Sequence, residues 1–318
     1  MSVLIIVESE NKLLKRNAAE VASYGVAFAE KLNISCAALA FHATNANELG
    51  QYGVAKVIHV SNVSTHFDAN AYANAIHGFA SQNNVTHIIM GSSADAKFIA
   101  PLLAAKLNAG YAPNVIALPD ELSPITVKRT AFTNKAFVHT QLLTACTVIG
   151  VGNNAFGVIE NPVTCTVKEV DAENSDSNLE QVAIEKTTGK ATIADADVVV
   201  SGGRGLKGPE NWHLIEELAE VLDAATACSK PVSDMGWRSH DEHVGQTGKP
   251  VSTNLYIAIG ISGAIQHLAG VNSSKVKVVI NNDPDAPFFK AADYGVVGDA
   301  FEVVPKLTQK LKAFKALA

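Results

Sequence analysis

Glycine-rich turns with polar side chains follow several apolar segments in the second half of this 318-residue sequence. The stretch LYIAIGISGAIQHLAGV at 255–271 joins an apolar run to a helical pattern through Ile261, Ser262 and Gly263. Backbone N–H groups at such a turn, and the positive end of a following helix, favour a bound anion. The stretch therefore predicts contact with a phosphate group, although it matches neither of the two common phosphate-loop patterns.

The turn GRGLKG at 203–208 fits the G-x-G-x-x-G pattern of dinucleotide-binding proteins, and it lies between a predicted strand and a predicted helix. In that pattern an acidic residue ends the following strand. Here Asp223 closes the helix and precedes the strand, so the acidic residue is out of place. An NAD(P)-dependent Rossmann oxidoreductase that uses this turn stays the alternative function.

The loop VGQTGKP at 244–250 is similar to a P-loop in its Gly248-Lys249 pair. A P-loop also needs a glycine five positions earlier, and a Ser or Thr after the lysine to hold magnesium. This sequence has no glycine there and has Pro250 in place of the hydroxyl residue. Hydrolysis of a nucleoside triphosphate is therefore disfavoured, and a dinucleotide bound without magnesium fits these turns best.

Four longer motifs resemble, in order and spacing, the carboxy-terminal FAD-binding domain of the electron-transfer flavoprotein alpha subunit family. They are SGGRGLKGPEN from residue 201, CSKPVSDMGW from 228, VGQTGKPVSTNLYIAIGISGAIQHLAG from 244 and INNDPDAPFFKAADYGVVGD from 280. The resemblance is near-continuous over 197–305 and weaker over the first 185 residues, where the family has an α/β domain that meets its beta subunit.

The resemblance implies which residues contact FAD. Ser262 and the N–H groups from Gly263 onward would receive the diphosphate. His267 would hydrogen-bond the flavin pyrimidine carbonyl, Thr247 would place its hydroxyl at flavin N5, and Asn281 and Asp299 would hold the adenosine end. Lys230, Thr247 and His267 would tune the redox properties. The full set that the resemblance implies is Arg204, Ser229, Lys230, Val244, Gly245, Gln246, Thr247, Ser262, Gly263, Ala264, Ile265, Gln266, His267, Asn281 and Asp299.

Lys230 departs from the family pattern, which commonly has arginine after this serine. The family arginine lies against the flavin, where its cation favours the reduced, anionic ring. Lysine keeps the charge but loses the planar guanidinium, and it can lose its proton where it is desolvated. We expect FAD to bind, with the reduced ring less stabilised than in a Lys230→Arg variant.

The function that the resemblance implies is that of an electron carrier without a substrate of its own, so an enzymatic activity stays uncertain. The family works as a heterodimer whose beta subunit binds AMP or a second FAD. Electrons come from flavoprotein dehydrogenases, for example the acyl-CoA dehydrogenases of fatty acid beta-oxidation, and leave to a quinone oxidoreductase or another acceptor. For residues 1–120 alone, a regulatory nucleotide-binding module stays a further possibility.

The elements that position these motifs alternate between short apolar strands and helical patterns. In the first half, strands are predicted at 3–7, 35–40, 56–60 and 87–91, with helices over 13–32 and 69–82. Residues 125–167 read as further strands that extend or flank the first sheet. The polar stretch DAENSDSNLEQ at 171–181 reads as a solvated connection, and a domain boundary is predicted near residue 186.

The second half repeats the α/β alternation from DVVVSGGRG at 197–205 to an amphipathic terminal helix over FEVVPKLTQKLKAFKALA. The predicted fold class is α/β with two domains. Residues 1–185 would form an adenine-nucleotide α hydrolase-like domain with extra strands that contacts the beta subunit. Residues 186–318 would form a doubly wound, parallel-sheet FAD-binding domain.

Composition excludes several other classes. A formal charge of −6 argues against nucleic acid as a partner, and no apolar run is long enough to insert into a membrane. The apolar run at 3–7 is too short for a signal peptide, so a prokaryotic, cytoplasmic location is expected. No metal is expected, since the loop His240-Asp241-Glu242-His243 reads as solvated. The dispersed cysteines, Cys36, Cys146, Cys165 and Cys228, read as free thiols.

Overall fold

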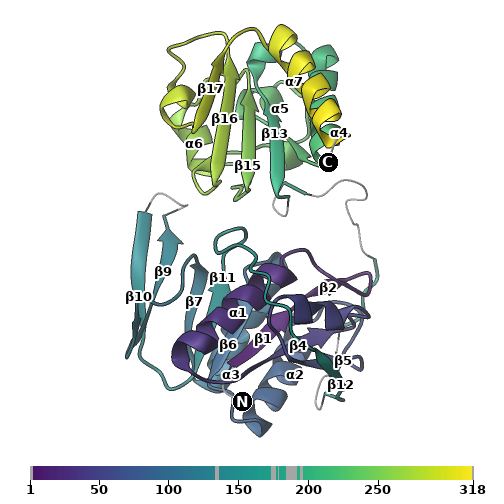
Figure 1. Cartoon of the computed structure of the whole chain (residues 1–318), viewed down its shortest axis with the longest axis vertical. Coiled ribbons are helices and arrows are strands. Elements are labelled where there is room, and N and C mark those ends of the chain that lie inside the picture. Colours follow the sequence, from purple (N-terminus) through teal and green to yellow (C-terminus); the bar gives the residue numbers. More distant parts are fainter. Residues whose placement is uncertain are drawn as a thin grey trace. The chain divides into compact units, whose positions relative to one another are not determined.

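The computed structural model describes residues 3–132, 136–172, 177, 179–183, 192–193 and 196–316. The chain forms two compact units, the first of residues 1–130 and 137–186 and the second of residues 131–136 and 187–318 (Figure 1). The boundary that the sequence predicts near residue 186 lies outside the described residues. Both units are α/β with parallel strands, so the predicted fold class is confirmed.

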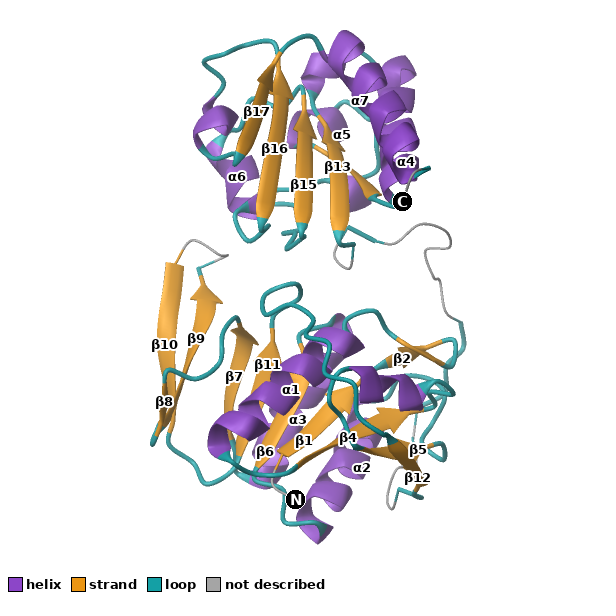
Figure 2. Cartoon of the chain, viewed as in Figure 1, coloured by secondary structure: helices purple, strands orange, loops and turns teal. Residues whose placement is uncertain are grey.

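The first unit is built on one ten-stranded sheet, shown with its strands in orange in Figure 2. The strand order is β10-β9-β7-β11-β6-β1-β4-β5-β12, with β8 paired to β9. The six strands from β7 to β5 in this order are parallel, and β7 pairs antiparallel with β9. The strands are β1 (Val3–Val7), β4 (Cys36–Phe41), β5 (Lys56–Val60), β6 (His87–Gly91), β7 (Gly110–Val115), β8 (Glu121–Leu122), β9 (Ile125–Ala131), β10 (Ala136–Leu142), β11 (Thr147–Val151) and β12 (Thr166–Glu169).

Helices cover both faces of this sheet, which explains why its central strands are continuously apolar. In β1, Val3, Ile5 and Val7 join a core with helix α1 (Ala18–Leu32) and the 3₁₀ helix η1 (Ala46–Gln51). Leu4 and Ile6 face the opposite core, against α2 (Ala69–Gln82) and α3 (Ala94–Leu107). A small hairpin of β2 (Ser9–Glu10) and β3 (Leu13–Leu14) precedes α1.

Some predicted elements of the first unit differ from the structure. The predicted helix over 13–32 begins only at Ala18, because Leu13 and Leu14 pair with the strand at Ser9–Glu10. Strand β11 does not flank the sheet; it lies inside it, parallel to both β6 and β7. Burial on both faces requires the small and β-branched side chains that its sequence TVIGV provides.

The second unit is a five-stranded, fully parallel sheet in the order β14-β13-β15-β16-β17. Helices α4 and α7 share one core with the sheet, while Val271 of α6 and Phe288 lie in the other core. Its strands are β13 (Val198–Gly202), β14 (Ala225–Cys228), β15 (Leu255–Ile259), β16 (Val276–Asn281) and β17 (Tyr294–Val297). Its helices are α4 (His213–Leu222), α5 (Lys230–Asp234), α6 (Ile265–Val271) and α7 (Ala300–Lys315), with the 3₁₀ helices η2 (Arg204–Leu206), η3 (Pro209–Trp212), η4 (His240–Glu242) and η5 (Pro287–Lys290).

Two further predictions bear on the whole chain. Each of the four cysteines is a free thiol in the structure, as the sequence predicts. Among the described residues, none of the helices combines the length and the apolar character that a membrane span requires.

Glu20 on α1 is a buried carboxylate that fixes the segment after β11. Its two oxygens accept hydrogen bonds from the backbone N–H groups of Asn154, Phe156 and Gly157, at 2.7 to 2.8 Å. Charge-assisted bonds of this length are stronger than neutral ones. Glu20 therefore ties α1 to a segment that is 134 or more positions away in sequence.

Replacing Glu20 by alanine should lower the free energy of unfolding by about 2 kcal/mol, because three partly buried N–H groups lose their charged acceptor. Glu20→Gln keeps one acceptor oxygen and should cost less. Urea unfolding measures both, and Glu30→Ala on the exposed surface of the same helix is the matched control. Equal stability of the Glu20→Ala and Glu30→Ala variants would contradict this role.

Candidate functional site

The predicted site residues lie on loops at the carboxyl edge of the second sheet. Gly202 ends β13, Cys228 ends β14, Ile259 ends β15 and Asn281 ends β16. Strand β13 pairs with β14 on one side and with β15 on the other, so the chain direction across the sheet reverses there. Open α/β sheets bind ligands at this position, outside the carboxyl ends of the strands.

The turns after β13 and β15 contact each other backbone to backbone. Gly203 N–H donates to the Ile259 carbonyl at 2.8 Å, and Gly205 N–H donates to the Gly260 carbonyl at 3.1 Å. A Cβ atom on Gly203 would lie 2.1 Å from the Gly260 oxygen, and one on Gly260 would lie 2.8 Å from the Gly205 Cα. These glycines therefore serve close packing between two turns.

This packing bears on the interpretation of the segment 203–208 as a dinucleotide-binding turn that leads directly into a helix. The segment 203–208 does not open a long helix, because it forms the 3₁₀ turn η2 and α4 begins only at His213. Asp223 caps the end of α4 with φ 52°, before β14, as the sequence predicts. The geometry that a G-x-G-x-x-G dinucleotide fingerprint requires is thus missing from this turn.

The turn after β15 combines exposed residues with one glycine, Gly263, that packs tightly against η5. Gly263 has φ 86°, and a Cβ atom there would lie 2.4 Å from the Phe288 nitrogen, so only glycine fits. Phe288 N–H donates to the Ser262 carbonyl at 3.0 Å, which fixes this turn to η5. Ser262, Ala264, Ile265 and Gln266 are exposed, and α6 itself is only seven residues long.

His267 lies inside the domain, only 7% exposed. Its Nε2 is 2.9 Å from the Tyr256 hydroxyl, while its buried Nδ1 has no hydrogen-bond partner in the described part of the chain. Burial lowers the pKa of His267 to about 4, and the nearby His243 acts in the same direction, while the Val244 backbone opposes them. The imidazole is therefore neutral at physiological pH.

The loop 243–249 is attached to both β14 and α6. Val244 N–H donates to the Cys228 carbonyl at 3.0 Å, and Gln246 N–H donates to the Gln266 carbonyl at 2.7 Å. Gly245, with φ 153°, lies against Gly270, on which a Cβ atom would be 2.6 Å from the Gly245 Cα. Val244 is fully buried, whereas the side chains of Gln246 and Thr247 are exposed.

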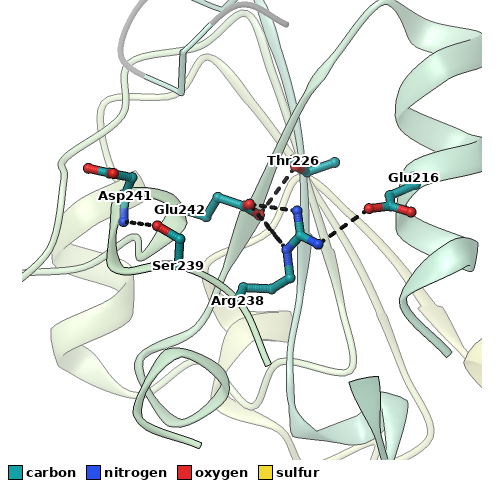
Figure 3. Close-up of polar contacts among 6 residues, drawn as sticks. All are labelled: Glu216, Thr226, Arg238, Ser239, Asp241 and Glu242. Atoms are coloured by element: carbon teal, nitrogen blue, oxygen red, sulfur yellow. Dashed lines mark hydrogen bonds and ion pairs between the residues drawn. The ribbon is translucent and has the colours of Figure 1, made fainter. Parts of the chain in front are cut away.

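The segment before this loop carries a charged network that the sequence analysis missed. Arg238 contacts Glu242 through Nε at 3.0 and 3.1 Å and through a terminal nitrogen at 2.6 Å. Its other terminal nitrogen donates to Glu216 on α4 at 3.3 Å, and Glu242 also accepts from Thr226 on β14 at 3.2 Å (Figure 3). The Arg238 guanidinium lies 5.4 Å from the Trp212 ring centre.

The segment 240–243 is not simply a solvated loop, contrary to the expectation from sequence. His243 is buried, Glu242 is in the Arg238 network, and His240 Nδ1 is 2.9 Å from the Ser233 hydroxyl. His240 and Asp241 are exposed, and Asp241 pairs with Lys249 at 3.0 Å. No group of three or more His, Cys, Asp or Glu side chains within the described ranges is arranged to hold a metal ion.

The remaining predicted residues lie at the ends of strands or at the starts of helices. Ser229 is buried after β14, and its N–H donates to the Gly202 carbonyl at 3.1 Å. Lys230 is exposed, with its Nζ 4.0 Å from Asp234, and Arg204 is exposed on η2. Asn281 is buried and donates to the Ile261 carbonyl at 3.1 Å, whereas Asp299 caps α7 by accepting from Phe301 N–H at 2.9 Å.

The structure thus brings the predicted residues to one edge of one sheet. Three residues that support them, Arg238, His243 and Tyr256, were not predicted. Tyr256 lies in an apolar strand, so the sequence gives no sign that its hydroxyl meets an imidazole. His243 and Arg238 lie in polar sequence, where charged residues are ordinarily solvated, so only the fold shows their burial and pairing.

The buried His267 gives the stability of this unit a pH dependence. Its pKa is lower in the folded chain than the 6.5 of the unfolded chain, so unfolding takes up a proton between pH 6.5 and 4. Above pH 6.5 this group does not reduce the free energy of unfolding. As the pH falls from 6.5 towards 4, protonation of the unfolded chain lowers the free energy of unfolding. Urea unfolding across this range should show that His267→Gln removes a slope of up to about 1.4 kcal/mol per pH unit.

His213→Gln is the control, because it shows how the loss of an exposed imidazole in the same unit changes the dependence of the unfolding free energy on pH. A His267→Gln variant whose pH dependence matches the wild type would contradict the neutral, buried imidazole.

Two observations agree with a dinucleotide bound at the carboxyl edge of the second sheet. The turns offer exposed backbone and hydroxyl groups beside glycines that exclude any side chain, and His267 Nδ1 is a buried polar atom that lacks a partner among the described residues. Buried polar groups ordinarily have partners, so Nδ1 is a group that a bound ligand could satisfy.

Comparison with known proteins agrees with this site. Residues 192–272 match the electron transfer flavoprotein FAD-binding domain, and residues 3–175 match the electron transfer flavoprotein domain. The predicted cofactor, FAD, is confirmed by the first of these matches.

Three relatives are similar over most of the chain. The electron transfer flavoprotein subunit alpha of Paracoccus denitrificans is 37% identical over 313 residues, which cover 98% of this chain and 100% of that protein. That of Bacillus subtilis (strain 168) is 37% identical over 279 residues, 84% of this chain and 83% of that protein. The mitochondrial subunit of Dictyostelium discoideum is 39% identical over 243 residues, 73% and 68% respectively. The chain belongs to the electron transfer flavoprotein alpha subunit family.

Proposed function

We propose that this chain pairs with an electron transfer flavoprotein beta subunit and carries electrons on FAD from flavoprotein dehydrogenases to a quinone oxidoreductase or another acceptor. Acyl-CoA dehydrogenases of fatty acid beta-oxidation are the donors we expect, in a bacterial cytoplasm. The beta subunit would hold AMP or a second FAD, and the first unit of this chain would contact it. The observation that carries the proposal is the gathering of the four family motifs at one sheet edge around a neutral, buried imidazole.

FAD supplies the redox chemistry in this proposal, and the chain supplies contacts. The exposed turn from Ser262 to Gln266 would receive the diphosphate through backbone N–H groups and the serine hydroxyl. Asn281 and Asp299, at the ends of β16 and β17, would hold the adenosine end. Arg204 and Ser229 would contact the cofactor from the ends of β13 and β14.

The flavin ring would lie beside the loop Val244–Thr247. Gly245 and Gln246 would run along the ring edge, and the exposed Thr247 hydroxyl would reach N5. A neutral His267 can donate a hydrogen bond to a carbonyl without placing a fixed positive charge beside the ring. Such a donor stabilises negative charge that develops on a bound group.

Lys230 would supply the nearest mobile cation. In the structure its side chain is exposed, and its ammonium lies 4.0 Å from Asp234, a distance at which an exposed ion pair contributes little. The side chain is therefore free to turn towards a bound flavin. Its compact charge would stabilise the reduced ring less than a planar guanidinium would.

The alternative, an NAD(P)-dependent oxidoreductase built on 203–208, receives no support from the fold. Gly203 and Gly205 are in contact with the Gly260 turn, and no acidic residue ends β14, whose last residue is Cys228. A nicotinamide cofactor would lack the ribose contact that this acidic residue makes in Rossmann domains.

Purification of the chain with its beta subunit tests the proposal. The heterodimer should carry FAD bound to this chain, an acyl-CoA dehydrogenase with its substrate should reduce the flavin, and NADH alone should not. His267→Gln should keep the FAD but lower its midpoint potential, because a donor to the reduced ring is lost. A colourless heterodimer that refuses added FAD, or turnover with NADH as the only donor, would contradict the proposed function.

The Arg238 network holds the loop that this function requires. Glu242 immediately precedes His243 and Val244, and the network ties it to α4 and β14 (Figure 3). A bidentate Arg–carboxylate pair restricts geometry more than a single hydrogen bond does. We infer that the network keeps the segment 243–247 in the conformation that FAD meets.

Replacing Glu242 by glutamine should weaken FAD binding about tenfold. Without the charged pair, FAD binding has to order the loop itself, and a cost of roughly 1.4 kcal/mol corresponds to a tenfold higher dissociation constant. Flavin fluorescence during titration of the FAD-free heterodimer measures the dissociation constant. Glu217→Gln, an exposed change on α4, is the matched control. Identical dissociation constants for the Glu242→Gln and Glu217→Gln variants would remove the network from the binding function.

A further inference from the structure

Tyr256 in the middle of the sheet has no accessible surface, and its hydroxyl is buried with it. Burial raises the pKa of this phenol well above its usual value, so the hydroxyl carries its proton at neutral pH. The structure gives this hydroxyl a hydrogen bond with His267 Nε2 at 2.9 Å, and the Ser201 side chain lowers the pKa of the phenol, as a donor to the phenol oxygen does. With Ser201 as a donor, the phenol proton goes to the His267 nitrogen or stays unpaired.

The two possible tautomers of His267 differ in what they leave unpaired. If Nε2 carried the proton, it would donate to the phenol oxygen, and the buried phenol proton would lack an acceptor. An unpaired buried donor costs about 1 to 3 kcal/mol. If Nδ1 carries the proton, Tyr256 donates to Nε2 and the phenol is satisfied. The second arrangement is favoured because it leaves only one polar group, Nδ1–H, for another partner.

Neighbouring groups hold the two rings in this relation. Phe288 stacks parallel to the Tyr256 ring, with centroids 6.4 Å apart and an interplanar angle of 2°, and its centroid is 6.1 Å from that of His267. The titratable group that acts on His267 from outside is His243, in the loop before β15, and the Val244 backbone favours a protonated ring. Val244 makes no hydrogen bond with Nδ1, which has no partner among the described residues.

We propose that Tyr256 is a positioning residue that fixes His267 as the neutral Nδ1–H tautomer and so leaves one N–H donor for the bound cofactor. The proposal rests on the proposed function for the identity of the cofactor. The tautomer itself does not depend on the cofactor: it depends on the hydrogen bond between Tyr256 and Nε2, on the Ser201 side chain and on the burial of both rings.

The first test reads the tautomer directly and needs no cofactor. Histidine-selective ¹⁵N labelling of the full-length chain, in the heterodimer with FAD removed, distinguishes protonated from unprotonated ring nitrogens, and His267→Gln assigns the signal. The wild type should show a protonated Nδ1 and an unprotonated Nε2. Tyr256→Phe should populate the other tautomer, whereas Tyr294→Phe, the same change at an exposed position, should not.

A wild-type Nε2–H tautomer, or an unchanged tautomer in Tyr256→Phe, would overturn the proposal. The wild-type spectrum decides the tautomer even if Tyr256→Phe fails to fold. A colourless heterodimer would count against the proposed function and leave this result untouched.

The second test uses the FAD-loaded heterodimer. Tyr256→Phe should shift the flavin midpoint potential downwards, because the N–H donor is no longer held in one place. In a His267→Gln background the same substitution should cause no further shift, since the two residues act as one unit. Additive shifts from the two substitutions would show that Tyr256 acts independently of His267 and would refute the positioning role.

Discussion

The arrangement of the site depends on the backbone contact between the turns after β13 and β15. Gly203, Gly205 and Gly260 approach so closely that a Cβ atom on any of them would overlap the facing backbone. This contact lies where the chain direction across the sheet reverses, and the exposed residues Ser262 and Ala264–Gln266 follow it in sequence. The remaining loops then attach to this pair of turns: Ser229 N–H bonds to Gly202, and Asn281 bonds to the Ile261 carbonyl.

Two different kinds of interaction position the polar groups around that contact. Buried groups are held by specific pairs, as in the bond between Tyr256 and His267, where burial favours the neutral imidazole. Closer to the surface, the partly buried Arg238 and Glu242 hold the loop by charge-assisted bonds. The first arrangement determines the chemistry that the site offers, and the second keeps the loop in place.

The sequence predicts the two-domain α/β fold and the strands β1, β5 and β6, because short apolar runs are typical of strands that are buried on both faces. It does not predict that β11 enters the centre of the first sheet, since pairing order depends on contacts remote in sequence. In the second unit the motifs name the residues at the sheet edge. They do not reveal that the 203–208 glycines pack against Gly260, or that Glu242 and His243 are held inside the loop, because both facts depend on which segments meet in space.

Hydrogen–deuterium exchange of the heterodimer, with and without FAD, tests the central claim that one edge of the second sheet holds the cofactor. FAD should protect the backbone amides of the turns at 203–206, 244–248 and 262–267 together, and the exposed surface of α4 should not respond. Protection confined to other parts of the chain, or none at these turns, would contradict the account.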